Sequence, residues 1–176
     1  MVEIGQAGYP LAMRARSRFL TESNSHREGG AVPHSAHFRE QLREADLRVT
    51  QPRVAVLEAL VAHPHADTET IFSAVRDTLP NVSRQAIYDV LHALTTAHLI
   101  RRIQPSGSSA RYESRVGDNH HHVVCRGCRA IADVDCAVGA APCLTPSDDA
   151  ALDGFVLDEA EVIYWGFCAD CVAASP

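Results

Sequence analysis

Residues 83–113, SRQAIYDVLHALTTAHLIRRIQPSGSSARYE, decide the fold. The stretch begins with Ser83, a favourable helix N-cap, and its apolar residues then recur at helical spacing from Ile87 to Leu94. Two short strands are predicted next, at 98–104 and 110–113, joined by a turn of proline, glycine and serine. A helix followed by such a hairpin predicts the second helix and the wing of a winged helix-turn-helix.

Further helices are predicted before this stretch. Apolar residues recur at helical spacing in three segments, 37–45, 54–61 and 71–79. Thr50 is expected to cap the second of these helices, with Pro52 in its first turn. The sequence His63-Pro-His predicts a break after that helix. Residues 34–114 are therefore expected to form a winged-helix domain, and residues 1–33, rich in glycine, proline and serine, a disordered extension.

The composition changes after Gly117. Residues 1–117 hold 14 arginines and 12 acidic residues, whereas residues 118–176 hold two arginines and ten acidic residues. The net charge of −6 is therefore unevenly distributed, and residues 1–117 carry a small positive charge that suits binding to a nucleic acid. Residues 115–119 are predicted to be a linker and residues 120–176 a small α/β domain, so that the expected fold class is α+β.

All six cysteines lie after residue 124. Four of them form two Cys-x2-Cys pairs, Cys125 with Cys128 and Cys168 with Cys171. Two such pairs can close a tetrahedral site of four thiolates, which favours structural zinc over the alternatives of redox-active dithiols or free buried thiols. For the remaining Cys136 and Cys143 we consider two roles, small buried residues or a redox-active thiol pair.

A second candidate for metal binding is the run Asn119-His120-His121-His122. On a strand, His120 and His122 face one side and His121 faces the other. Two imidazoles on one side of a strand can bind one metal ion, and an exposed polar run is the alternative. Any further ligands must come from elsewhere in the chain.

The polar end of the helix that begins at Ser83 is a candidate DNA-reading surface. In a helix-turn-helix this end of the second helix enters the major groove. Tyr88 offers a ring to thymine methyl groups, and Arg84 can reach guanine or phosphate; an ordinary amphipathic helix is the alternative. Two arginines near the start of the helix predicted at 54–61 are further candidates. The candidate DNA-binding residues are therefore Arg48, Arg53, Ser83, Arg84, Gln85 and Tyr88.

Five motifs resemble, in order, those of the ferric uptake regulator (Fur) family. They are Leu47-Arg-Val-Thr-Gln-Pro-Arg, Ser83-Arg-Gln-Ala-Ile-Tyr-Asp-Val-Leu, Arg111-Tyr-Glu, His120-His-His-Val-Val-Cys-Arg-Gly-Cys and Cys168-Ala-Asp-Cys. The resemblance covers about residues 36–172 and is strongest to the FurA subgroup of iron- and peroxide-responsive repressors. It implies structural zinc at the four paired cysteines. It also implies a homodimer formed through the second domain, with two winged helices on an AT-rich palindromic operator.

The resemblance further implies a regulatory metal between the two domains. Its ligands would be His65, Glu113, His120, His122 and Asp133. Fe(II) is expected there, with Mn(II) or Zn(II) as alternatives. Asp133 favours peroxide sensing, because the family's iron-responsive members often carry glutamate at this place. Some relatives have a further metal site with an aspartate where this chain has His121, so that site is doubtful here.

The expected function is that of a cytoplasmic, metal-dependent transcriptional repressor that senses iron and peroxide and controls oxidative-stress genes such as catalase-peroxidase. A zinc-responsive repressor of metal-uptake genes is the alternative. A non-haem iron enzyme with two histidines and a carboxylate is a remote alternative, because nothing in the sequence marks a substrate pocket. No apolar run approaches the roughly 18 residues that span a bilayer, so no membrane partner is expected.

Overall fold

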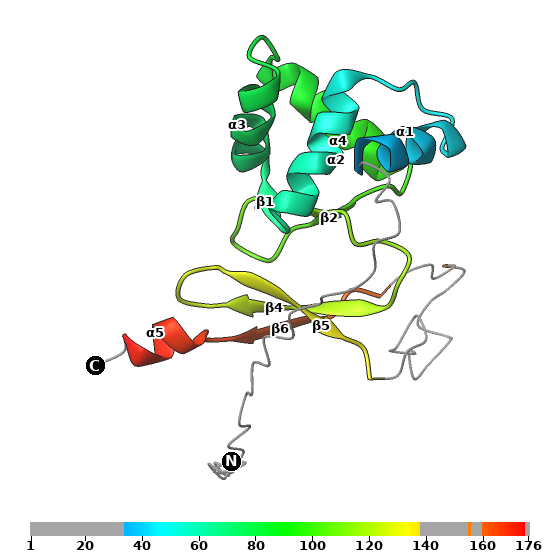
Figure 1. Ribbon diagram of the computed structural model, residues 1–176. Helices are drawn as coiled ribbons and strands as arrows, with labels where there is room; N and C mark the ends of the chain where they lie inside the picture. The colour runs from blue at the N-terminus through cyan, green and yellow to red at the C-terminus, as the bar shows by residue number, and fades with distance from the viewer. Residues whose placement is uncertain (1–33, 138–154, 156–159, 175–176) are drawn as a thin grey trace, which may run out of the picture. The chain divides into compact units, whose positions relative to one another are not determined.

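The structure, a computed structural model, describes residues 34–137, 155 and 160–174 (Figure 1). All described residues belong to one compact unit. The predicted N-terminal extension therefore lies outside the described residues. Within them, no helix is both long enough and apolar enough to cross a membrane.

Four helices form the first part of the described chain. They are α1 (His34–Glu44), α2 (Gln51–Ala62), α3 (Thr68–Thr78) and α4 (Arg84–Thr96). Helix α2 packs against each of the other three (Figure 1). Their apolar sides meet in one core, whose fully buried members include Leu42, Leu57, Leu60, Ile71, Ile87, Leu91 and Leu94. This core positions α4 and leaves the polar residues at its N-terminal end in solvent.

Side-chain caps begin two of these helices. Asp67 accepts hydrogen bonds from the backbone N–H of Thr70 at 2.8 Å and from its hydroxyl at 2.7 Å, and so begins α3. Ser83 accepts from the N–H three residues further on at 3.1 Å and begins α4. Thr50 lies at the N-cap of α2, but its side chain makes no capping hydrogen bond, so that prediction was wrong.

A three-stranded antiparallel sheet combines a short strand between α2 and α3 with a hairpin after α4. Its strands are β1 (Ala66–Asp67), β2 (Arg101–Ile103) and β3 (Arg111–Glu113), in the order β1-β3-β2. Strands β2 and β3 are the predicted wing, with Arg101 opposite Glu113. Strand β1 was not predicted, because two residues are too few to show a strand period. Its pairing of Ala66 with Tyr112 brings the preceding residue, His65, to the end of β3.

A second three-stranded sheet holds the cysteine and histidine motifs. Its strands are β4 (His120–Cys125), β5 (Ile131–Asp135) and β6 (Ile163–Gly166), and the short helix α5 (Ala169–Ala173) follows. Strand β4 lies in the middle, antiparallel to β5 and parallel to β6 (Figure 1). This register places Asp133 opposite His122 and Gly166 opposite Cys125. The predicted α+β class, a winged helix ahead of a small mixed domain, is confirmed.

Replacing Asp67 with alanine is expected to lower the free energy of unfolding by about 1 kcal/mol. The change removes both hydrogen bonds that begin α3 and a favourable charge at the positive end of the helix dipole. Asp77→Ala is the control, because its carboxylate lies near the opposite end of the same helix, where its loss should be neutral or slightly stabilising. Chemical denaturation measures both, and equal stability of the two variants would contradict the capping role.

The same stabilisation depends on pH. Hydrogen bonds from Thr70 lower the pKa of Asp67 below its ordinary value. A carboxylate with a lowered folded-state pKa stabilises the fold above its unfolded pKa of about 4, and this is lost as the pH falls through the folded value. The stability difference between Asp67→Ala and the parent should therefore shrink below about pH 4.

Candidate functional site

The two Cys-x2-Cys turns meet at one end of β4. The sulfur atoms of Cys125, Cys128, Cys168 and Cys171 all lie within 4.8 Å of one another, and the pair Cys128–Cys168 is 3.6 Å apart. A tetrahedral zinc ion with Zn–S bonds of about 2.3 Å places its sulfurs about 3.8 Å apart. The four thiols therefore fit one zinc ion. The parallel pairing of β4 with β6 produces this arrangement, because Gly166 lies opposite Cys125 and two residues before Cys168.

The four sulfurs differ in acidity. The backbone N–H of Cys168 donates to the sulfur of Cys125 at 3.3 Å and, with the N–H of Cys128, lowers the pKa of Cys125 to about 6. The neighbouring sulfurs, first that of Cys168, raise the pKa of Cys171 to about 12. Four thiolates this close repel one another, so a cation is needed to keep all of them deprotonated, and a zinc ion would supply it.

Gly127 lies between the first two cysteines. A Cβ atom at this position would lie 2.7 Å from the sulfur of Cys171 and 3.2 Å from its Cβ. A side chain here would therefore push away one of the four sulfurs. The glycine is required by close approach within the cysteine cluster.

A second cluster combines residues from both sheets. His65 precedes β1 and Glu113 ends β3, whereas His122 and Asp133 lie on β4 and β5. His65 Nε2 lies 3.0 Å from Glu113 Oε2 and 2.8 Å from Asp133 Oδ1, and His122 Nε2 lies 3.2 Å from Glu113 Oε2. Ligand atoms about 2.1 Å from one ion lie about 3.0 to 3.4 Å apart, so this group, the histidine–carboxylate centre, fits Fe(II), Mn(II) or Zn(II).

Three members of the histidine–carboxylate centre are largely removed from solvent, and Asp133 is the more exposed fourth, with a side chain that is 28% exposed. The side chains of Glu113 and His122 are each 2% exposed, and that of His65 is 10% exposed. Burial opposes ionisation of Glu113, but hydrogen bonds from His122 and His65 outweigh it and lower the pKa of Glu113 to about 2. Burial also favours neutral His65, yet its hydrogen bond to Glu113 and the charge of Asp133 raise its pKa. The carboxylates thus attract positive charge to this point, which a divalent ion can supply in place of histidine protons.

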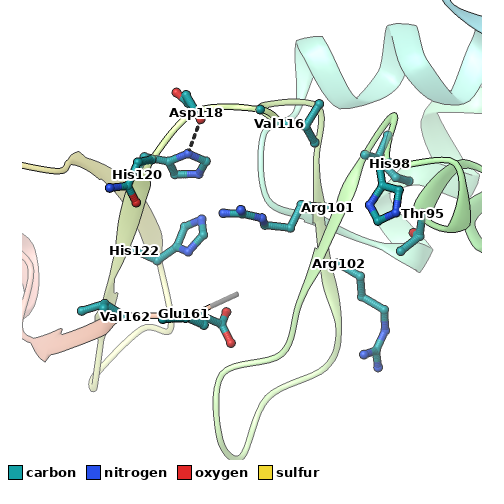
Figure 2. Close-up of a pocket in the computed structure, with 14 residues that line it drawn as sticks. Thr95, His98, Arg101, Arg102, Val116, Asp118, His120, His122, Glu161 and Val162 are labelled. Carbon is teal, nitrogen blue, oxygen red and sulfur yellow. Dashed lines mark hydrogen bonds and ion pairs between the residues drawn. The ribbon is translucent and has the colours of Figure 1, made fainter. Parts of the chain in front are cut away.

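His120 lies beside the four mutually close groups without joining them. Its Nε2 faces the other oxygen of Glu113, Oε1, at 3.2 Å, and its Nδ1 lies 2.7 Å from Asp118 Oδ1. Figure 2 shows the rings of His120 and His122 pointing to the same side, toward Arg101. A cavity of about 630 Å³ borders both rings. The five-ligand set expected from the family resemblance therefore stays a prediction. His120 contacts this set through its hydrogen-bond distance to Glu113.

His121 faces the opposite side of β4, as strand alternation predicts. It is 5% exposed, and its ring meets that of Tyr164 edge-on with 6.1 Å between centroids. Within the described ranges, the only groups of three or more potential ligands close enough for one ion are the four cysteines and the histidine–carboxylate centre. No third metal cluster forms around His121 among these residues.

The exposed end of α4 carries most of the candidate DNA-binding side chains. Tyr88 is 54% exposed, and Gln85 donates to a carboxylate one turn further along the helix at 2.8 Å. Arg84 forms an ion pair with Glu69 of α3, and its guanidinium carbon lies 4.4 Å from the centroid of the Phe72 ring. Arg84 is thus held by α3 but keeps an exposed, charged surface.

The other candidates from the sequence have local roles. The Ser83 oxygen caps α4, and the exposed Arg48 accepts a hydrogen bond at its carbonyl from Arg53 at 2.6 Å. Cys136 is half-buried, and its N–H donates to the Asn119 carbonyl at 3.2 Å. Cys143, its partner in the redox alternative, lies outside the described residues.

Sequence reasoning missed two residues near the histidine–carboxylate centre, Arg115 and Asp118, because both belong to a short polar segment that predicts a linker. Asp118 contacts His120, and Arg115 lies 3.5 Å from Asp133. The only signal in the sequence is an acidic residue two positions before a histidine, which is too common to single it out.

Comparison with known proteins identifies relatives across most of the chain. Residues 44–138 match the ferric uptake regulator family. The chain is 78% identical over 134 residues to the transcriptional regulator FurA of Mycobacterium tuberculosis, covering 76% of this chain and 89% of that protein. It is 30% identical over 137 residues to the peroxide operon regulator of Bacillus subtilis, covering 75% and 89%. The solved structure of the Helicobacter pylori ferric uptake regulator has the same fold, with a TM-score of 0.57 and 20% identity over 78% of this chain and 90% of that one.

The Gly127→Ala substitution is expected to weaken zinc binding by roughly tenfold or more, the usual cost of disturbing the support of a metal ligand. The added methyl group would displace the sulfur of Cys171. Gly166→Ala is the matched control, because a Cβ atom there meets nothing within 4 Å. Zinc release to a competing chelator measures the difference, and equal retention by the two variants would rule out the steric argument.

Proposed function

This chain belongs to the ferric uptake regulator family, and from that premise we propose that it is a dimeric, metal-dependent transcriptional repressor that senses iron and peroxide. The observation that carries the proposal is the histidine–carboxylate centre. His65 and Glu113 come from the helix-and-wing part of the chain, and His122 and Asp133 come from the second sheet. The chain is a regulator and not an enzyme. The four-cysteine cluster is proposed to hold structural zinc.

An ion in the histidine–carboxylate centre would couple the wing to the second sheet. Glu113 is the last residue of β3 and is paired with Arg101 of β2, so any movement of Glu113 is a movement of the wing. Metal binding favours the arrangement in which both parts supply ligands. In a dimer joined through the second domain, this arrangement fixes the separation of the two α4 helices and hence their fit to a palindromic operator.

The peroxide response is proposed to act on the same centre. Iron(II) held by the centre would supply the electron that reduces peroxide to hydroxide and a hydroxyl radical, and this radical would be the oxidant of a nearby imidazole. The cavity beside His120 and His122 has room for a molecule of that size, and His122 is the member of the centre that borders it (Figure 2). Oxidation of His65 or His120 would remove an imidazole ligand and loosen the coupling to the wing. Similarity to a protein named peroxide operon regulator supports the proposed peroxide response.

The proposed partner is an AT-rich palindromic operator in the cytoplasm, upstream of oxidative-stress genes such as catalase-peroxidase. Its proposed contacts are the side chains of Arg48, Arg53, Ser83, Arg84, Gln85 and Tyr88. Tyr88 and Gln85 lie at the exposed end of α4, where a recognition helix meets base edges. Arg48 and Arg53 precede or begin α2, where they can meet phosphates.

Loading with iron or with manganese separates metal sensing from peroxide sensing. Both forms should shift a palindromic operator in a gel, and hydrogen peroxide should release the DNA only from the iron form. Peptide mass mapping of the released protein should find added oxygen on His65 or His120. Equal peroxide sensitivity of both forms would rule out the iron-oxidation mechanism. Control by zinc alone, without a peroxide response, would favour the zinc-sensing alternative.

Replacing Arg84 with alanine is expected to weaken operator binding about tenfold and to reduce the slope of log K against log salt by about one. The change removes a guanidinium that is proposed to contact a phosphate of the DNA backbone. Glu69→Gln should act in the opposite direction, because the Glu69 carboxylate competes with phosphate for Arg84. Fluorescence anisotropy at several salt concentrations measures both effects, and an unchanged slope for Arg84→Ala would remove Arg84 from the phosphate contacts.

A further inference from the structure

The segment between the two sheets carries a guanidinium that contacts three carboxylates. Arg115 Nε donates to Asp118 Oδ2 at 2.6 Å, and one terminal nitrogen donates to Asp135 Oδ1 at 2.7 Å. The other terminal nitrogen lies 3.5 Å from Asp133 Oδ2. Every nitrogen of the guanidinium therefore faces a carboxylate, and the segment is fastened to β5.

Two of these carboxylates also contact histidines, one within the centre and one beside it. Asp133 turns its other oxygen, Oδ1, to His65 Nε2 at 2.8 Å. Asp118 turns its other oxygen, Oδ1, to His120 Nδ1 at 2.7 Å, which leaves Nε2 of that ring to face the centre. Asp118 and Asp133 thus share one geometry, with one oxygen on Arg115 and the other on a histidine.

We propose that Arg115 is a positioning residue of the histidine–carboxylate centre. By holding one oxygen of Asp133 and one of Asp118, it directs the other oxygen of Asp133 into the centre and fixes the ring of His120. The inference rests on the proposed function, because it takes this centre as the site of a regulatory divalent ion. A guanidinium suits the task, since its N–H groups form a rigid fork that fixes the direction of each carboxylate, whereas a lysine ammonium is a point charge.

Positioning and simple charge effects predict opposite results when Arg115 is removed. A cation near a metal site repels the metal, so its loss would tighten metal binding. A positioning residue holds a ligand in place, so its loss weakens binding, typically by about 10- to 100-fold. Positioning should dominate here, because three carboxylates offset the charge of Arg115 and its side chain is 38% exposed, where solvent and salt screen repulsion.

Titration with Mn(II), followed by the paramagnetic resonance signal of the free ion, tests the proposal on the zinc-loaded full chain. Arg115→Ala should raise the Kd for Mn(II) by about tenfold or more, and Arg115→Lys should recover little of the loss. Arg43→Ala is the matched control. Arg43 pairs with Glu40 three residues away, just as Arg115 pairs with Asp118, but it lies on α1 and should leave the Kd unchanged.

Unchanged or tighter Mn(II) binding by Arg115→Ala, or full recovery by Arg115→Lys, would overturn the positioning role. Zinc content and melting temperature of the same samples show whether each variant is folded, and if Arg115→Ala is not, Arg115→Lys alone decides. Glu113→Gln separates the two proposals. If it binds Mn(II) as the parent does, the proposed function fails and this inference with it. If it loses Mn(II) while the Arg115 variants match the parent, only the positioning role fails.

Discussion

Glu113 carries a negative charge that is almost fully removed from water, on a side chain that is only 2% exposed. A buried carboxylate is tolerated only when hydrogen-bonding or charged partners replace its lost hydration. Three imidazoles do so, with His65 and His122 at Oε2 and His120 at Oε1. Because His65 and Glu113 belong to the first sheet region and the other two histidines to β4, the need to satisfy one carboxylate connects the wing with the second sheet.

The backbone around His65 gives this connection its geometry. His65 has a φ of 57°, in the left-handed region that residues other than glycine seldom adopt. Such a conformation persists where its surroundings fix it from both sides. Here α2 ends at Ala62, and Ala66 pairs with Tyr112 only one residue after His65. The turn therefore has little freedom, and the imidazole is directed at Glu113.

The two candidate metal clusters differ in whether metal binding can affect the arrangement of the two sheets. All four cysteines belong to the second part of the chain, between the end of β4 and α5, so zinc there would stabilise one part of the chain without linking it to another. The histidine–carboxylate centre draws ligands from both sheets, so its occupancy is coupled to their arrangement. A permanent structural role suits the first cluster, and a regulatory role suits the second.

The sequence by itself determined the features that follow local rules: the helical spacing from Ile87 to Leu94, the hairpin after it, and the two cysteine pairs. It did not determine strand β1, or that Arg115 and Asp118 in a polar segment would orient metal-site histidines and carboxylates. Those features were decided by the tertiary structure, through strand register and side-chain direction. The physical reason is that a contact between distant residues depends on how separate elements pack, and no short pattern in the chain encodes that packing.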